Sequence, residues 1–277
     1  MIVPQPVPIY PTDPNFTGAP MAYMPPTLIN GPQNFVYIPD PMAELAASSG
    51  AVICQQVDMF QAMTGCQTQN RYHVFLQTPM GLKYAFKCSE RSGCCARCCC
   101  SGECRSMQMV VRHVISLDQL EGDLAKIFLR IDKPCKMGCC CLCRPYMDIR
   151  LADNGKYLGK VRQTCTCCDE DYEIYNAKGH MKYKINGDCC QAGFCCGSSG
   201  QKMSNIYFSI LQNGVIVGEI KKLRASWGEY FTKADSYQVT FPANATPEEK
   251  MVLIMSGLMI DYQVFENDDN VPHNYAY

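Results

Sequence analysis

The chain has 277 residues and a mass of 31.0 kDa, enough to bury a core in one large domain or two small ones. Its formal net charge is -1, which excludes the strongly basic composition of many nucleic-acid-binding proteins. The basic cluster at residues 221–224 is therefore interpreted as a solvated strand end, and no nucleic-acid partner is expected.

The N-terminus, Met1-Ile2-Val3-Pro4, lacks the basic start, the long apolar stretch and the small-residue cleavage site of a signal peptide. We therefore expect a protein that is made and kept in the cytosol and is not secreted. The 21 cysteines fit reduced thiols better than a disulfide framework, because their number is odd and many are adjacent in the sequence.

Residues 1–42 form a proline-rich segment with 11 of the 17 prolines and only two charged side chains, Asp13 and Asp40. Such a composition cannot supply a core and predicts an extended or polyproline-like tail. Because proline-rich runs dock in aromatic-lined grooves, the tail is a candidate contact for protein partners, with a solvated leader as the alternative.

The predicted folded domain covers residues 43–266 and begins with a weak helical stripe, Val52, Val57, Phe60 and Met63, before a stop at Gly65. Strand patterns follow, and three pairs of them flank turn sequences typical of hairpins. The pairs are 72–77 with 82–88, 147–151 with 157–163, and 206–211 with 215–220.

Part of this pattern is repeated, since the tyrosine, lysine and cysteine positions of residues 72–95 reappear in residues 172–190. The repeat predicts two related half-sheets. Three more patterns, at 107–113, 127–131 and 236–241, bring the total to about a dozen short strands.

The last predicted element is a helix over residues 247–265. Thr246 can cap it, Pro247 suits the first helical position, and Glu249 closes a capping box. Apolar side chains then cover every face, so the helix must be buried. They include Met251, Val252, Leu253, Ile254, Leu258 and Ile260.

This apolar helix fits a protein core better than a bilayer. Even residues 251–265 reach only about 22 Å, against roughly 30 Å of bilayer hydrocarbon, so we favour a core helix while leaving a lipid-inserted form open. A closed antiparallel barrel of about 12 strands around this helix removes the free strand edges and the exposed helix together. The predicted fold class is thus mainly β (α+β), followed by a polar tail at 267–277.

Several motifs, taken in order, resemble those of the phospholipid scramblase family, which belongs to the tubby-like superfamily. The resemblance runs from about Val52 to Glu266. It implies a proline-rich tail, a tubby-like twelve-stranded barrel around a C-terminal helix, acylated cysteines and calcium-stimulated movement of lipid between leaflets. The motifs are Val52-Ile53-Cys54-Gln55-Gln56, Asn70-Arg71-Tyr72, Cys94-Cys95-Ala96-Arg97-Cys98-Cys99, Cys139-Cys140-Cys141-Leu142-Cys143 and Ala234-Asp235-Ser236-Tyr237.

The resemblance implies that one cysteine cluster is lipidated. Exposed thiols between Lys136 and Arg144 would also be reactive and near anionic lipid, which suits acylation. Leu142 and Arg144 depart from the family pattern, which has proline and cysteine there, and unmodified surface thiols are the alternative. The candidate lipidation sites are Cys139, Cys140, Cys141 and Cys143.

A metal site competes for the other cysteine clusters. Cys95 with Cys98 and Cys165 with Cys168 have the spacing of zinc ligands, as does Cys140 with Cys143. Two such pairs would make a four-thiolate site if their loops converge. In a segment with so many cysteines, pairs with this spacing also arise by chance. A zinc site is therefore not favoured.

The segment that the resemblance assigns to calcium is degraded. Asp235 is its only anionic side chain, and Lys233 and Asn244 stand where the family pattern has carboxylates. Calcium takes six to eight oxygen ligands, several of them carboxylates. We therefore expect calcium binding at Asp235 and Asn244 to be weak or lost.

No hydrolase, transferase or redox motif is present in the sequence. The resemblance implies a scramblase-like protein at the cytosolic face of the plasma membrane or an organelle, moving phospholipids between leaflets without breaking a covalent bond. The alternative is a non-enzymatic structural or adaptor subunit that uses the barrel as a scaffold and residues 1–42 as its contact. An oligomer or larger assembly fits either hypothesis.

Overall fold

The structure is a computed structural model. It describes residues 39–56, 69–93, 105–115, 125–136, 143–166, 169–191, 205–223 and 236–265.

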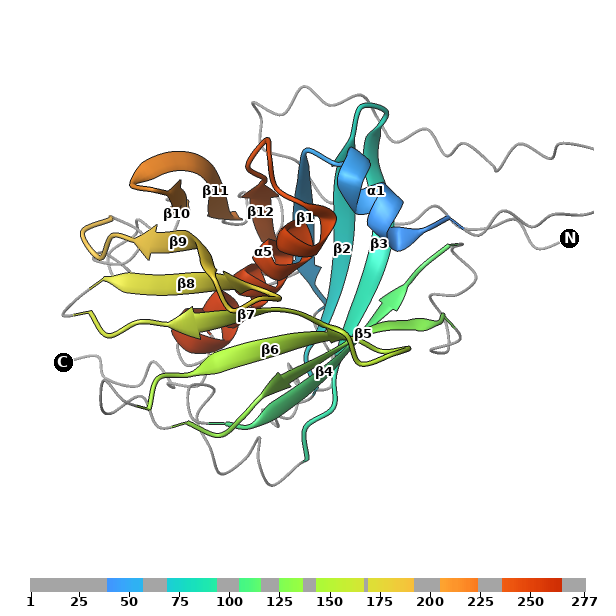
Figure 1. The fold of residues 1–277 in the computed structure, drawn as a ribbon, viewed down its shortest axis with the longest axis horizontal. Helices are drawn as coiled ribbons and strands as arrows, with labels where there is room; N and C mark the ends of the chain where they lie inside the picture. The colour runs from blue at the N-terminus through green and yellow to red at the C-terminus, as the bar shows by residue number, and fades with distance from the viewer. Residues whose placement is uncertain are drawn as a thin grey trace, which may run out of the picture.

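The described residues form twelve antiparallel strands that close into one barrel (Figure 1). Each strand pairs with its neighbours in sequence, and β1 closes the barrel by pairing with β12. This confirms the predicted fold class. The strands are β1 (Gly50–Gln55), β2 (Arg71–Thr78), β3 (Gly81–Glu90), β4 (Met107–His113), β5 (Ile127–Lys133), β6 (Tyr146–Leu151), β7 (Tyr157–Gln163), β8 (Glu170–Asn176), β9 (Met181–Gly187), β10 (Ile206–Gln212), β11 (Val215–Leu223) and β12 (Ser236–Thr240).

The three predicted hairpins are confirmed as β2–β3, β6–β7 and β10–β11. In the last of them Asn213 and Gly214 have φ angles of 53° and 80°, the left-handed values that a tight two-residue hairpin turn requires. Side chains then alternate across the wall, as on β4, where Met107 and Met109 are buried and Gln108 is exposed.

Antiparallel order gives the barrel two chemically different rims. At one rim, here called the hairpin rim, β2, β4, β6, β8 and β10 end and short turns predominate. At the opposite rim, here called the cysteine rim, β1, β3, β5, β7, β9 and β11 end and longer connections follow. Six cysteines fall between β3 and β4, five between β5 and β6, three between β7 and β8, and four between β9 and β10. One more, Cys66, falls between β1 and β2, so nineteen of the 21 cysteines belong to connections of the cysteine rim.

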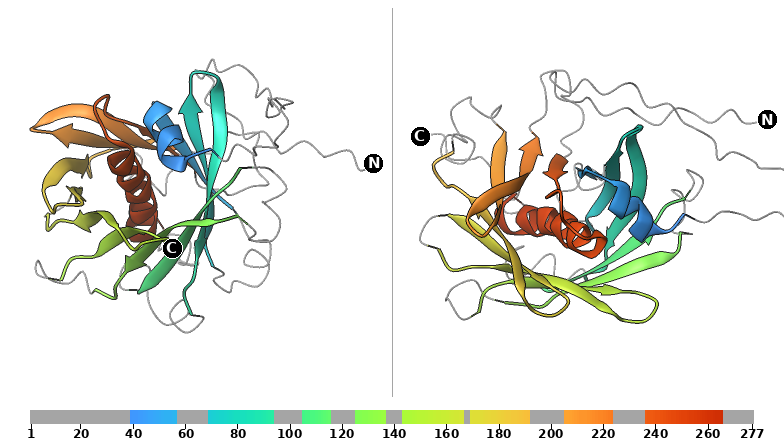
Figure 2. Two further views of the ribbon diagram at one scale, coloured as in Figure 1. Left: turned by 45° about the vertical axis from the view of Figure 1, so that its right-hand side comes forward. Right: turned by 45° about the horizontal axis from the view of Figure 1, so that its top comes forward.

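The C-terminal helix α5 (Pro247–Ile260) enters the barrel at the hairpin rim and continues as the π-helix η2 (Asp261–Phe265) (Figure 2). Its predicted capping box is confirmed, because Thr246 Oγ1 accepts from Glu249 N at 3.2 Å and Glu249 Oε2 accepts from Thr246 N at 3.1 Å. Every residue from Met251 to Phe265 is buried except the partly buried Val264. Among the described helices, none is both long and apolar enough to cross a bilayer.

The helical interpretation of residues 43–64 is wrong for its central part. Helix α1 (Pro41–Ala47) is short and begins within the predicted tail, where Asp40 Oδ1 accepts from Met42 N. Val52 lies on strand β1, because pairing of that strand with both β2 and β12 completes the barrel and outweighs a weak helical stripe. Val57, Phe60 and Met63 lie outside the described residues.

Lys250 joins the two helices at the hairpin rim. Its Nζ donates to the carbonyl oxygens of Leu45, Ala46 and Ser48 at 3.0, 3.0 and 2.7 Å. These carbonyls lie at the C-terminal end of α1, where the last carbonyls lack the usual intrahelical donor, and that of Leu45 also accepts from Ser48 N and Oγ at 3.2 and 2.8 Å. The ammonium group thus holds α1 against the entrance of α5.

We predict that Lys250→Met lowers the free energy of unfolding by about 1.5–3 kcal/mol, because methionine keeps the apolar stem but leaves these carbonyls without their charged donor. Denaturant unfolding measures the change. The matched control is Lys182→Met, which removes only a 3.6 Å ion pair with Glu249 from a partly exposed lysine and should cost less than about 1 kcal/mol. Equal losses in the two variants would contradict the role given to Lys250.

Candidate functional site

The helix that fills the barrel ends in a buried polar cluster just inside the cysteine rim. Asp261 accepts hydrogen bonds from Tyr72 Oη at 2.6 Å and from Tyr237 Oη at 2.5 Å, and all three side chains are buried. The two tyrosines come from β2 and β12, on either side of β1. The carboxylate therefore ties the end of α5 to the wall instead of facing open space.

A second buried cluster lies at the same depth around Glu90. Its carboxylate accepts from Tyr262 Oη at 2.9 Å and from the backbone N–H of Asn70 at 3.0 Å. It also forms an ion pair with Arg105 Nη2 at 3.3 Å. The side chains of Arg105 and Glu90 are 1% and 0% exposed. Because these groups bond one another inside the wall, they position the helix and offer no open site for a substrate.

The cysteines differ in exposure between wall and rim. Cys54 and Cys88 are buried in the wall, and burial raises the pKa of Cys88 to about 12, which keeps that thiol protonated and unreactive. Cys143, the described member of the candidate lipidation cluster, is exposed at the start of β6. Cys139, Cys140 and Cys141 lie outside the described residues.

The candidate metal ligands are only partly described. Cys165 is exposed just after β7, whereas Cys95, Cys98 and Cys168 lie outside the described residues. Two cysteine-bearing connections do meet, since the Cys189 amide donates to Asp169 Oδ1 at 3.2 Å. The group there is Asp188, Cys189 and Cys190, whose ligand atoms lie within 4.8 Å of one another; Asp188 and Cys190 are exposed and Cys189 is partly buried. Zinc at any of these thiols stays untested.

The strand β12 separates the two ends of the candidate calcium segment. Ser236 begins the strand at the cysteine rim, while Asn244 is exposed beyond its other end, at the hairpin rim. Asp235 itself lies outside the described residues. Five extended residues span roughly 13 Å between the first and last Cα atoms. Ligands of one calcium ion lie within about 2.6 Å of it, so Asn244 cannot share an ion with a group beside Ser236.

The outer wall across β2 to β6 carries a positive charge pattern. The strand pairing places Lys87 opposite both His73 and Arg112, and Arg130 opposite Arg150. Like charges in directly opposed cross-strand positions destabilise a sheet. Burial, with the positive charges of Lys87 and Arg71, lowers the pKa of His73 to about 4. Near Lys87 the wall therefore disfavours further positive charge, and an anion would reduce the repulsion between Arg130 and Arg150, whereas Asp132 lies opposite Asp148.

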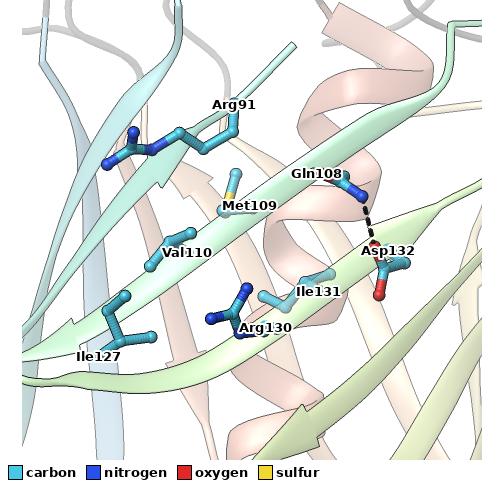
Figure 3. A pocket seen from close by; sticks show the side chains of 8 residues that line it. All are labelled: Arg91, Gln108, Met109, Val110, Ile127, Arg130, Ile131 and Asp132. Atoms are coloured by element: carbon cyan, nitrogen blue, oxygen red, sulfur yellow. Dashed lines mark hydrogen bonds between the residues drawn. The ribbon is translucent and has the colours of Figure 1, made fainter. Parts of the chain in front are cut away.

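A hollow of about 340 Å³ lies on this wall next to the cysteine rim. Figure 3 shows Arg91 and Arg130 on either side of Val110, with Asp132 at one end accepting from Gln108 Nε2 at 3.2 Å. Arg91 follows the end of β3, and Gln108 and Asp132 lie near the rim ends of β4 and β5. The hollow thus combines two guanidinium groups, a carboxylate and apolar side chains.

Sequence reasoning did not find this hollow or the cluster around Asp261. The alternation Ile127-Phe128-Leu129-Arg130-Ile131-Asp132 already places Arg130 and Asp132 on one face of a strand. The missing information was the register, which aligns Arg130 with Val110 and Asp132 with Gln108.

Comparison with known proteins identifies the family of this chain. A closed barrel filled by its own C-terminal helix defines the structural class. The family model described as Scramblase matches residues 30–267, and the chain belongs to this family.

Several curated relatives have similar sequences over most of the chain. It is 27% identical to phospholipid scramblase 1 of Mus musculus over 258 residues, 91% of this chain and 70% of that protein. Identity to phospholipid scramblase 1 of Homo sapiens is 27% over 85% of this chain and 69% of the relative. Phospholipid scramblase 2 of Homo sapiens is 25% identical over 90% of this chain and 76% of the relative. No solved structure gives a significant match.

We predict that calcium binds this protein with an affinity no tighter than millimolar, because one carboxylate and an amide at the far end of β12 cannot supply six or more oxygens. Titration calorimetry of the chelator-treated protein measures it, with Asp235→Ala as the paired variant. Sub-millimolar binding that Asp235→Ala abolishes would overturn this prediction.

We predict that the protein loses stability as the pH falls from 6.5 toward 4, with a contribution from His73 on the order of 2 kcal/mol. In that window the unfolded chain takes up a proton on His73 whereas the folded protein does not, because the pKa in the folded state is about 4. Unfolding by denaturant across this pH range should show that His73→Gln removes the contribution. His180→Gln, at an exposed position, is the control and should keep the wild-type slope.

Proposed function

We propose that this protein is a scramblase-like protein of the cytosolic face of a membrane, where it moves phospholipids between leaflets. The observation that carries the proposal is the gathering of 19 cysteines in connections of a single rim. Membership of the scramblase family supports the lipid substrate. The similar proteins from Mus musculus and Homo sapiens are themselves phospholipid scramblases by name, which supports the same assignment.

Acylation at Cys139, Cys140, Cys141 and Cys143 would place the cysteine rim against the bilayer. Each buried methylene of an acyl chain contributes about 0.8 kcal/mol, so two or more chains hold a protein at a membrane without a spanning helix. The exposure of Cys143, Cys135 and Cys165 supports access of these connections to a lipid surface.

The packed interior restricts the route that a headgroup could take. Helix α5 and the inward side chains occupy the barrel, and Asp261 and Glu90 bond the helix to the wall at the cysteine rim. A polar headgroup would therefore travel along the outer wall or between protomers, or would require release of α5. We favour the outer wall, because it carries exposed arginines beside the rim.

A second candidate function is that of a structural or adaptor subunit. Exposed apolar side chains at hairpin-rim turns favour it, since Met80, Val215 and Ile216 are 88%, 64% and 65% exposed. Such side chains are suited to contact with a protein partner. The tail at residues 1–42 would provide a further contact in this hypothesis.

The test uses the full chain expressed in eukaryotic cells. We predict that the protein sediments with membranes, that hydroxylamine releases it by cleaving thioesters, and that replacing the four candidate lipidation cysteines by serine has the same effect. The control is Cys165→Ser with Cys168→Ser, which should leave the protein with the membranes. Sedimentation that survives both hydroxylamine and the four serine substitutions would contradict lipid anchoring there.

Reconstitution then tests lipid movement itself. Vesicles with a fluorescent lipid in one leaflet should lose their asymmetry faster with the acylated protein than without protein. A rate equal to that of empty vesicles, with and without calcium, would reject scrambling and favour the adaptor hypothesis.

A further inference from the structure

We propose that the hollow between β3, β4 and β5 binds the zwitterionic headgroup of a phospholipid, with its phosphate between Arg91 and Arg130 and its amine at Asp132. This inference rests on the proposed function, because it names the site on the outer wall where a lipid headgroup would bind during its movement between leaflets. Three observations carry it: the charges that line the hollow, the register that opposes like charges, and the position beside the cysteine rim.

The phosphate end is defined by the two arginines. Arg91 and Arg130 stand on opposite sides of Val110 (Figure 3). Planar guanidinium groups bind phosphate through paired hydrogen bonds and are less strongly hydrated than ammonium groups. Arg130 also lies directly opposite Arg150 on β6, so a phosphate there would relieve a like-charge pair.

The cross-strand row that contains Arg130 also contains a neutral hydrogen-bond donor, the hydroxyl of Ser89. Ser89 on β3, Val110 on β4 and Arg130 on β5 are aligned by the register. Ser89 Oγ is buried and has no hydrogen-bond partner among the described residues. A buried hydroxyl without a partner costs free energy, so this row contains an unused donor next to the hollow-lining Val110.

The amine end is defined by Asp132. Its carboxylate is exposed, accepts from Gln108 Nε2 at 3.2 Å and lies at the end of the hollow nearest the cysteine rim. A site for an anion alone gains nothing from a carboxylate, whereas a headgroup with a phosphate and an amine uses both charges. The lining therefore favours a zwitterionic headgroup over a purely anionic one.

Size and position point to a lipid. A volume of about 340 Å³ lies near the lower end of small-molecule sites, roughly 300–1,000 Å³, and suits a headgroup without its acyl chains. Ile127 and Val110 are half-buried and give the hollow an apolar contact surface. Since Arg91, Gln108 and Asp132 lie at the cysteine rim, the hollow adjoins the bilayer that this rim would face.

The experiment measures binding of the full chain, purified without acyl groups, to vesicles of phosphatidylcholine and to vesicles of phosphatidylglycerol at the same salt. We expect Arg130→Gln to weaken binding to phosphatidylcholine about tenfold or more, because a charge-assisted hydrogen bond is lost. Arg130→Lys, which keeps the charge, should weaken it less. The matched control is Arg162→Gln, which removes the same charge from an exposed position on β7 outside the hollow and should change this binding less than about twofold.

Asp132→Asn separates a zwitterionic site from an anion site. It should weaken binding to phosphatidylcholine and strengthen binding to phosphatidylglycerol. Equal losses in Arg130→Gln and Arg162→Gln would mean general electrostatic attraction and overturn the site. Identical lipid preferences of Asp132→Asn and the wild type would overturn it as well.

Soluble glycerophosphocholine distinguishes the source of the headgroup. Weaker binding of this compound than of phosphatidylcholine vesicles is expected if the ligand is a membrane lipid, and equal affinity would overturn that assignment. Failure of scrambling leaves these binding measurements unaffected. Conversely, scrambling that Arg130→Gln leaves unchanged, in a protein that shows no binding at the hollow, would reject this site while the proposed function stands.

Discussion

The structure depends on a helix that is apolar on every side and occupies the centre of a closed sheet. Burial of Met251 to Ile260 supplies much of the core, because each fully buried large aliphatic side chain contributes about 1.5–3 kcal/mol. The wall approaches this helix closely at two glycines. A Cβ atom on Gly257 would lie 2.9 Å from Ile53 Cδ1, and one on Gly159 would lie 2.9 Å from Val252 Cγ2. Helix and wall are therefore fitted to each other, and neither can be exchanged independently.

Polar contacts at the two ends of α5 define the position of this helix along the barrel axis. Lys250 bonds the carbonyls of α1 at the hairpin rim, while Asp261 bonds Tyr72 and Tyr237 at the cysteine rim. Apolar contacts are non-directional, so they define the axial position of a helix less sharply than polar contacts do. Charged groups that must keep their partners fix its position. The same contacts oppose withdrawal of α5 into lipid. The outer wall is therefore the surface that we propose to contact phospholipids.

The sequence alone predicted most of the secondary-structure elements and the closure of the sheet into a barrel. Alternating strands, the Asn213-Gly214 turn and the capping box at Thr246 are local signals, and each was confirmed. The stripe through Val52 failed because a short apolar strand and a weak amphipathic helix share residue types, and only pairing with β2 and β12 decides between them. The outer hollow depends on register between strands joined by long connections, as between β3 and β4. No local pattern specifies that register, so Arg91 and Arg130 could not be brought together from the sequence.

The chain crosses the barrel an odd number of times, twelve times as a strand and once as a helix. The described chain consequently enters at one rim and leaves at the other, with α1 at the hairpin rim and Phe265 at the cysteine rim. Strands of about seven residues make the two exits stand roughly 20 Å apart along the barrel axis. If the cysteine rim rests on a bilayer, an attachment before residue 39 stands off from the lipid by the height of the barrel, whereas one after residue 265 starts beside it. The barrel thus acts as a spacer that assigns its two ends to different surroundings.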